Sequence, residues 1–222
     1  MHWRVGLIDS GADATRVAAA ARFAPDGTPA GAAGADPTGH GTRVAALLLE
    51  AAPDIELVLA QVFAGGAPTS AAAVAAAIDW CIAEGAQLVH LSLGLAADRA
   101  PLRAAVARAV DAGLLVVAAT PARGAAVYPA AYPGVIRATG DARCAAGEIS
   151  RLGPATFGGC VRTAAGAGQG ASVGAAAVSR ALLAAVAPGS PLRLAVQALA
   201  ARARYDGPER RGRAAPHVRG DP

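Results

Sequence analysis

The chain has 222 residues, of which 54% are hydrophobic and 16% charged, and its formal net charge is +4 at pH 7. The apolar residues are mostly Ala, and no run of them reaches the roughly 18 to 20 residues that a membrane span requires, so we expect a soluble protein that does not bind membranes. All 20 basic residues are Arg, and the absence of Lys excludes P-loop nucleotide sites, Schiff-base enzymes and Ser-Lys dyads.

Short apolar runs alternate with helical patterns along most of the chain, which is typical of βαβ units. The predicted strands are 4–8, 16–23, 55–62, 87–93, 114–119 and 135–139. The predicted helices are 40–51, 70–83, 101–112, 172–187 and 192–203. The pattern therefore predicts an α/β fold with a parallel sheet. Ligands in such open sheets bind beyond the carboxyl ends of the strands, where we expect Asp9, His40 and Ser92.

The C-terminal segment differs in composition from the rest of the chain. Six of the Arg residues lie within 202–222, together with several Pro and Gly residues and only one aromatic, Tyr205. No helical or strand period is present there. We predict one folded domain over 1–201 and a solvated, disordered tail over 202–222 that does not bind nucleic acid.

The cysteines and the N-terminal residues indicate the cellular compartment in which the protein is expected. Cys81, Cys144 and Cys160 are odd in number and widely spaced, which fits neither a disulfide framework nor a metal knuckle. Met1 is followed almost at once by an apolar strand, without the pattern of a signal peptide. We therefore expect reduced thiols and a cytoplasmic protein.

Three polar residues stand at positions suited to chemistry. Asp9 follows an apolar strand, His40 opens an amphipathic helix between two glycines, and Ser172 begins a helical run after a Gly-rich stretch. A helix N-terminus offers free N–H groups that favour an oxyanion. Taken singly, the Asp could cap a turn and the Ser could cap a helix. The inference therefore depends on their joint order.

That order resembles the subtilisin family of serine proteases, in which the catalytic Asp, His and Ser follow one another along the chain. The resemblance covers residues 4 to about 187. The motifs that carry it are Asp9-Ser10-Gly11, His40-Gly41-Thr42, Leu91-Ser92-Leu93-Gly94, Tyr128-Pro129 and Gly170-Ala171-Ser172. The resemblance implies a three-layer α/β/α fold with a mostly parallel, doubly wound sheet.

By position in these motifs, Asp9 would orient His40, His40 would take the proton of Ser172, and Ser172 would attack a peptide carbonyl to give an acyl-enzyme. No cofactor is expected for this chemistry.

The resemblance also implies where a substrate binds. Ser92, Leu93 and Gly94 would pair with an extended peptide, and Gly65 and Gly66 would flank its other side. The expected partner is therefore a protein or peptide. The carboxylates are too dispersed along the chain to predict a metal site.

The chain departs from the family pattern where the oxyanion is bound. Family members carry a Gly-Asn pair after the strand that corresponds to 114–119, whereas this chain has Ala122 there and contains no Asn. The remaining candidate donors are the Ser172 backbone, Thr120, Arg123 and Gln169. Loss of one such donor costs about 100-fold to 1,000-fold in kcat. We therefore expect a slow, selective protease that processes a precursor or leader peptide.

Two alternatives remain open from the sequence. The first is a peptide-binding pseudoprotease that retains the cleft but has lost efficient catalysis with the oxyanion Asn. The second is an α/β-hydrolase, because Gly170 to Gly174 also fits a nucleophile elbow, and Asp206 and His217 follow in that fold's order. This second reading needs catalytic residues in the segment predicted as a tail.

Overall fold

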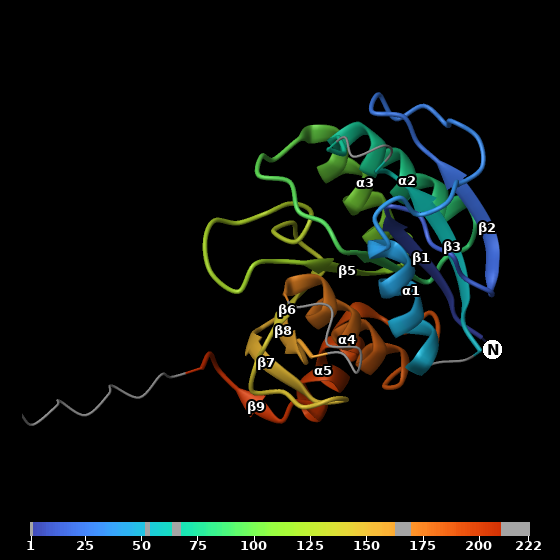
Figure 1. The fold of residues 1–222 in the computed structure, drawn as a ribbon. Helices are drawn as coiled ribbons and strands as arrows, with labels where there is room; N and C mark the ends of the chain where they lie inside the picture. Colours follow the sequence, from blue (N-terminus) through green and yellow to red (C-terminus); the bar gives the residue numbers. More distant parts are fainter. Residues whose placement is uncertain (1, 52–53, 64–67, 163–169, 210–222) are drawn as a thin grey trace, which may run out of the picture.

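The computed structural model describes residues 2–51, 54–63, 68–162 and 170–209. Within them one sheet has the strand order β2-β3-β1-β4-β5-β6-β8-β7-β9 (Figure 1). Strands β1 to β6 and β8 pair in parallel, β7 is antiparallel to β8, and β9 is parallel to β7. The strands are β1 Arg4–Asp9, β2 Val17–Arg22, β3 Glu56–Gln61, β4 Leu88–Leu91, β5 Leu115–Ala119, β6 Val135–Gly140, β7 Ile149–Gly153, β8 Thr156–Gly159 and β9 Tyr205–Asp206.

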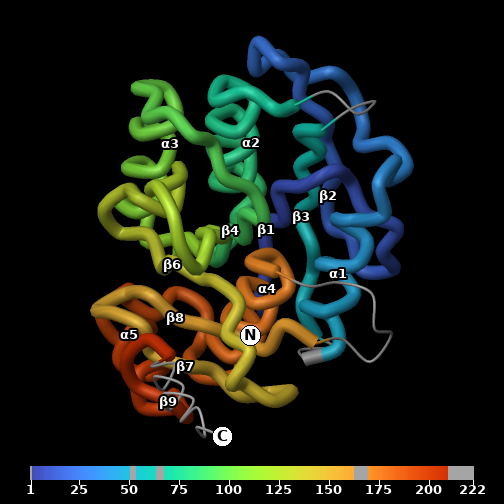
Figure 2. The backbone as a smooth tube through the Cα atoms, turned by 60° about the vertical axis from the view of Figure 1, so that its left-hand side comes forward, coloured from blue at the N-terminus to red at the C-terminus, as the bar shows by residue number. Residues whose placement is uncertain are grey.

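Helices cover both faces of this sheet, as Figures 1 and 2 show. The helices are α1 His40–Ala51, α2 Ala71–Ala83, α3 Ala100–Asp111, α4 Ala171–Leu183 and α5 Leu192–Arg202. Helices α2 and α3 pack on one face, and α1, α4 and α5 pack on the other. The predicted three-layer α/β/α class is confirmed.

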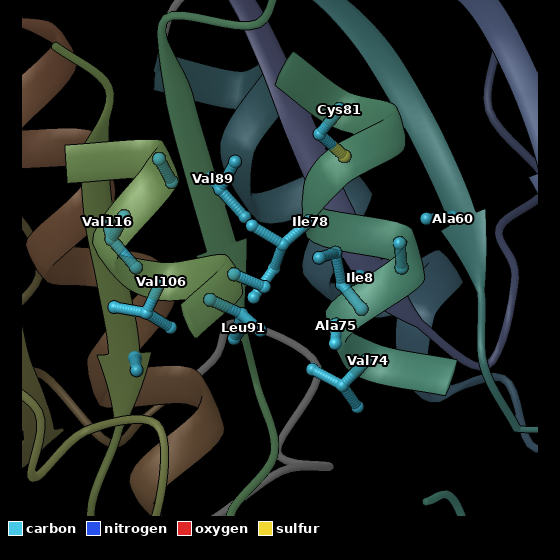
Figure 3. Close-up of a cluster of buried hydrophobic side chains, with 14 of the residues drawn as sticks. Ile8, Ala60, Val74, Ala75, Ile78, Cys81, Val89, Leu91, Val106 and Val116 are labelled. Atoms are coloured by element: carbon cyan, nitrogen blue, oxygen red, sulfur yellow. The ribbon is translucent and has the colours of Figure 1, made fainter. Parts of the chain in front are cut away.

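Strand β1 shows why the central strands are continuously apolar. Its Ile8 belongs to the core under α2 and α3, whereas its neighbour Leu7 belongs to the core under α1 and α4. Successive side chains of a strand point to opposite faces, and both faces are covered here. Figure 3 shows Ile8 beside Ile78 of α2 and Val89 of β4 in the first of these cores. Two polar side chains, Asp9 and Gln61, stand at the ends of β1 and β3.

The six predicted strands and five predicted helices are all present, and their ends shift by at most four residues. The sequence did not predict β7, β8 and β9, which have five, four and two residues. Strands β4 and β5 are as short as β8 and β7 but are almost wholly apolar, whereas β7, β8 and β9 mix Gly, polar and charged residues with few apolar ones. No helix in the described part of the chain combines the length and apolar composition needed to cross a membrane.

The predicted domain boundary at residue 201 falls inside α5, and the residues that follow it extend the sheet. Tyr205 of β9 pairs with Ser150 of β7, and the guanidinium of Arg143 lies 5.0 Å from the Tyr205 ring centroid. Arg143 Nη2 also donates to the Gly207 carbonyl at 2.9 Å. The remainder of the predicted tail, 210–222, lies outside the described residues.

Helix α4 packs unusually close to the sheet because it carries a glycine at the contact. A methyl group on Gly174 would lie 2.5 Å from Gly140 Cα and from the carbonyl carbon of Thr139. Both contacts are with backbone, which cannot rotate away. The absence of a side chain at Gly174 therefore sets how near the N-terminal half of α4 approaches the end of β6.

We predict that Gly174→Ala lowers the free energy of unfolding by about 3 kcal/mol, at the upper end of the cost of overpacking a core. Urea denaturation measures the change. Gly153→Ala is the matched control, because its new methyl group would lie 3.5 Å from Thr156, an ordinary contact. The control should change the free energy of unfolding by less than about 0.5 kcal/mol. Equal losses in the two variants would contradict the packing argument.

Candidate active site

Asp9 and His40 come together at the carboxyl end of β1. Asp9 is the last residue of β1, and only 4% of its side chain is exposed, whereas His40 is the first residue of α1 and its side chain is 35% exposed. His40 Nδ1 lies 2.7 Å from Asp9 Oδ1. This contact directs the Nδ1 proton to the carboxylate and leaves Nε2 as an acceptor on the side that faces the cavities.

The approach of α1 to β1 depends on glycine. A Cβ on Gly41 would overlap the carbonyl oxygen of Gly11 and would lie 3.2 Å from Asp9 Cβ. Gly11 itself has φ of +105°, a conformation that side chains strongly disfavour. The two motif glycines thus allow the first turn of α1 to lie against the end of β1, which brings His40 within hydrogen-bond reach of Asp9.

A second carboxylate, Asp36, organises the loop in front of α1. Its Oδ2 accepts from Thr42 N and Thr42 Oγ1, both at 2.8 Å, and its Oδ1 accepts from Ser10 Oγ at 2.8 Å. Partial burial favours the protonated form, but these hydrogen bonds outweigh it and lower the pKa of Asp36 to about 2. Asp36 therefore stays ionised and holds the N-terminal turn of α1 against Ser10, the neighbour of Asp9.

Gln61 connects the same loop to the sheet through hydrogen bonds of its side chain. It ends β3 and is only 3% exposed. Its Nε2 donates to the Ser10 carbonyl at 2.8 Å, and its Oε1 accepts from Gly34 N at 2.8 Å. Sequence reasoning missed Asp36 and Gln61. The only local signal was an Asp four residues before His40, because each role also depends on a partner more than 20 residues away, which is Ser10 in both cases.

The environment of His40 raises its pKa above the ordinary value. The hydrogen bond from His40 to Asp9 is the largest cause of this higher pKa, and partial burial of the ring opposes it. The charge of Asp36 adds a smaller increase in the pKa, and the charge of Arg43 lowers it. The imidazole is thus a stronger base than a free histidine. It becomes neutral, and able to accept a proton, only above this raised pKa.

Ser172 lies on the opposite side of His40, in the first turn of α4. It shares the lining of a cavity of about 170 Å³ with His40 and Arg43. Its Oγ donates to the Ser92 carbonyl at 3.4 Å. Because α4 begins at Ala171, the backbone N–H of Ser172 belongs to the turn whose amides have no acceptor within the helix. His40 thus contacts Asp9 and shares a cavity lining with Ser172.

A second cavity, of about 340 Å³, opens on the Asp9 side of His40. Asp9, His40, Ser92 and Phe63 line it, along with Ser10, Pro37 and Thr38. Phe63 contributes an apolar wall that the sequence did not suggest. Ser92 touches both sides of the cleft, because its carbonyl faces Ser172 while the residue also lines this second cavity.

The remaining predicted substrate residues continue from Ser92. Leu93 is buried in the core under α2 and α3, and Gly94 packs against Val127, where a Cβ would lie 2.9 Å from a Val127 methyl carbon. Leu95 then pairs with Tyr128 through two backbone hydrogen bonds of 2.7 and 2.9 Å. Of the three, Ser92 borders a described cavity and Leu93 faces inward. Gly65 and Gly66 lie outside the described residues.

The predicted oxyanion donors do not all line the same cavity. Thr120 directly follows β5, and its backbone N–H is already bonded to the Ala138 carbonyl at 2.8 Å. Arg123 lines a different cavity, together with Asp141 and Glu209. Gln169 lies outside the described residues. The Ser172 backbone amide is thus the candidate donor that the described residues bring into the cleft.

The α/β-hydrolase alternative finds no support in the described residues. Asp206 lies on β9, at the outer edge of the sheet, where it pairs with Arg151 at 3.8 Å. His217 lies outside the described residues. No cluster of three or more His, Cys, Asp or Glu side chains able to hold a metal ion occurs in the part of the chain that is described.

We predict that His40 titrates above the ordinary histidine value and that Asp36→Asn lowers this pKa, because the variant removes one of the negative charges that stabilise the imidazolium. Proton NMR of the His40 ring, assigned with His40→Gln, measures it. Asp26→Asn is the matched control, since Asp26 is a carboxylate of the same loop that bonds only to Thr28. Identical titrations in native protein and Asp36→Asn would contradict the electrostatic assignment.

Most of the chain is similar in sequence to one known protein family. A sequence profile of the subtilase family matches residues 3–191. A subtilisin-like protease, het-Q2, from Podospora anserina is 39% identical over 124 residues, which are 52% of this chain and 32% of that protein. Subtilisin Savinase from Lederbergia lenta is 35% identical over 108 residues, 44% of this chain and 40% of that protein.

The solved structure described as a lanthipeptide protease has a TM-score of 0.49 and 24% identity, and the match covers 61% of this chain and 47% of that chain. The matches thus span less than half the length of each of these relatives.

Proposed function

The chain belongs to the subtilase family, and from this premise we propose that it is a serine endopeptidase in which Ser172 is the nucleophile, His40 the general base and Asp9 the residue that orients His40. The observation that carries the proposal is the 2.7 Å contact between His40 Nδ1 and Asp9 Oδ1, together with the cavity whose lining His40 shares with Ser172.

The proposed reaction begins when a peptide carbonyl enters the cleft beside Ser172. His40 Nε2 takes the Ser172 proton while Oγ attacks the carbonyl carbon, and the imidazolium is stabilised by ionised Asp9. His40 then gives that proton to the leaving amine, and the C–N bond breaks to leave an acyl-enzyme. A water molecule, deprotonated by the same His40, hydrolyses the ester and releases Ser172.

The oxyanion of both tetrahedral intermediates would be bound by the backbone N–H of Ser172 at the N-terminus of α4. A helix N-terminus is suited to negative charge. The side-chain amide used elsewhere in the family is absent, because position 122 is Ala and the chain has no Asn. We therefore expect a kcat about 100-fold to 1,000-fold below that of an enzyme with the full set of donors.

Such slow turnover suits the limited cleavage of a dedicated precursor better than bulk digestion. Removal of a leader peptide is the form of precursor processing that we propose. A narrower prediction is that the chain is the maturation protease for the small subunit of quinohemoprotein amine dehydrogenase. A cytoplasmic location stays a prediction as well.

We predict that the native protein cuts a cognate precursor peptide once, at a defined bond, and that it degrades casein slowly. Incubation with candidate precursors, followed by mass spectrometry, identifies the bond. Ser172→Ala should abolish cleavage, because it removes the hydroxyl that attacks the peptide carbonyl in the proposed reaction. Ser190→Ala, which removes a hydroxyl from the loop before α5, should cut at the native rate.

Two results would contradict this proposal. Rapid, unselective digestion of casein would exclude a dedicated processing role. Tight binding of the precursor without cleavage, equal in native protein and Ser172→Ala, would instead identify the peptide-binding pseudoprotease that the missing oxyanion Asn favours.

A further inference from the structure

A histidine that the proposed reaction does not use is buried directly beneath the cleft. His90 lies in β4 and has no exposed surface. In the sheet register its neighbours are Leu7 of β1 and Val117 of β5, and both belong to the apolar core under α1 and α4. The imidazole therefore occupies a position that an aliphatic side chain fills in the adjacent strands.

Both ring nitrogens of His90 are hydrogen-bonded to hydroxyl groups. Nδ1 lies 2.9 Å from Ser179 Oγ on α4, and Nε2 lies 2.7 Å from Ser92 Oγ at the end of β4. A neutral imidazole has one donor and one acceptor, and each serine hydroxyl can take the complementary role. Burial lowers the pKa of His90 to about 4, so the ring is neutral at physiological pH and this pairing is complete.

The two serines that bracket His90 connect it to the nucleophile. Ser179 follows Ser172 by seven residues, two helical turns, so both side chains lie on the same face of α4. Ser172 Oγ donates to the carbonyl of Ser92, whose own side chain is bonded to His90. Strand β4 and the residue that follows it thus contact α4 at two points. His90 bonds to Ser179, and the Ser92 carbonyl accepts from Ser172.

Two attachments on one face of a helix fix both its rotation and its position along its axis. These attachments act in addition to the close backbone contact at Gly174, and they add direction, because hydrogen bonds depend on orientation whereas apolar packing does not. Ser92 also lines the cavity that contains Asp9 and His40. The same residue therefore relates the position of Ser172 to the position of its base.

We propose that His90 is a positioning residue, which clasps β4 to α4 through Ser92 and Ser179 and thereby aligns Ser172 with His40. The inference rests on the proposed function, since Ser172 is the nucleophile of that reaction. His90 does not touch substrate. It acts only through the two serines, and its effect on the reaction is an effect of geometry.

The test compares Ser179→Ala with the double variant His90→Leu/Ser179→Ala. Ser179→Ala leaves a buried ring nitrogen without a partner, so it should both destabilise the protein and misalign Ser172. The double variant replaces the buried pair with apolar groups and leaves Ser92 Oγ to water in the cavity that it lines, so it restores thermal stability but not the clasp. We expect both variants to react with a fluorophosphonate about 10-fold to 100-fold more slowly than native protein, as misplacement of a nucleophile predicts. Their KM for a cleavable peptide should remain within about threefold of native.

Ser150→Ala is the matched control. Ser150 is also a fully buried serine bonded to a side chain, Asp141 Oδ2 at 2.6 Å, but it lies on β7, away from the cleft. It should lower the unfolding midpoint without slowing the labelling of folded protein. If the double variant labels at the native rate once its stability is restored, His90 has only a structural role and the proposal is overturned.

An amide hydrogen-exchange measurement tests the clasp without reference to catalysis. Peptides that cover the first turn of α4 should exchange at least about 10-fold faster in the double variant than in native protein or Ser150→Ala, because local opening follows local stability. Unchanged exchange in this turn would overturn the proposal. Failure of native protein to label at all would refute the proposed function, whereas the exchange result would still decide whether His90 holds α4.

Discussion

The hydrogen bond between Asp9 and His40 is the constraint on which the arrangement of the site depends. It joins the end of a central strand to the first residue of a helix, and it forms only because glycines at 11 and 41 let the two backbones touch. A buried carboxylate is tolerated at this position because Ser10 N and His40 Nδ1 both donate to it. The loop before α1 is shaped around the same point, with Asp36 and Gln61 holding Ser10 in place.

The nucleophile is held by different means. Ser172 lies on α4, and the position of α4 against the sheet is set by the close contact at Gly174 and by polar contacts with β4. Neither contact involves Asp9 or α1. The site therefore joins two halves, one carrying base and orienting acid and the other carrying the nucleophile, and the halves also meet directly, because α1 packs against α4 and Arg180 of α4 pairs with Glu50 of α1 at 3.4 Å.

The sequence predicted those features of the fold and of the candidate site that depend on residues adjacent in the chain. The Asp9, His40 and Ser172 motifs each contain their own glycines, and the apolar runs of the central strands are long enough to recognise. The roles of Asp36, Gln61 and His90 could not be predicted, because each depends on at least one partner that lies between 26 and 89 residues away in the chain. The short strands β7, β8 and β9 were missed for a related reason, since pairing rather than local pattern defines them.

The central claim is that the Ser172 hydroxyl is a nucleophile made reactive by His40. The most direct measurement treats the native protein at pH 8 with a fluorophosphonate and maps the adduct by peptide mass spectrometry. We predict a single adduct on Ser172 that His40→Ala does not form at a detectable rate. An adduct on another residue, or equal labelling of Ser172 in His40→Ala, would contradict this account.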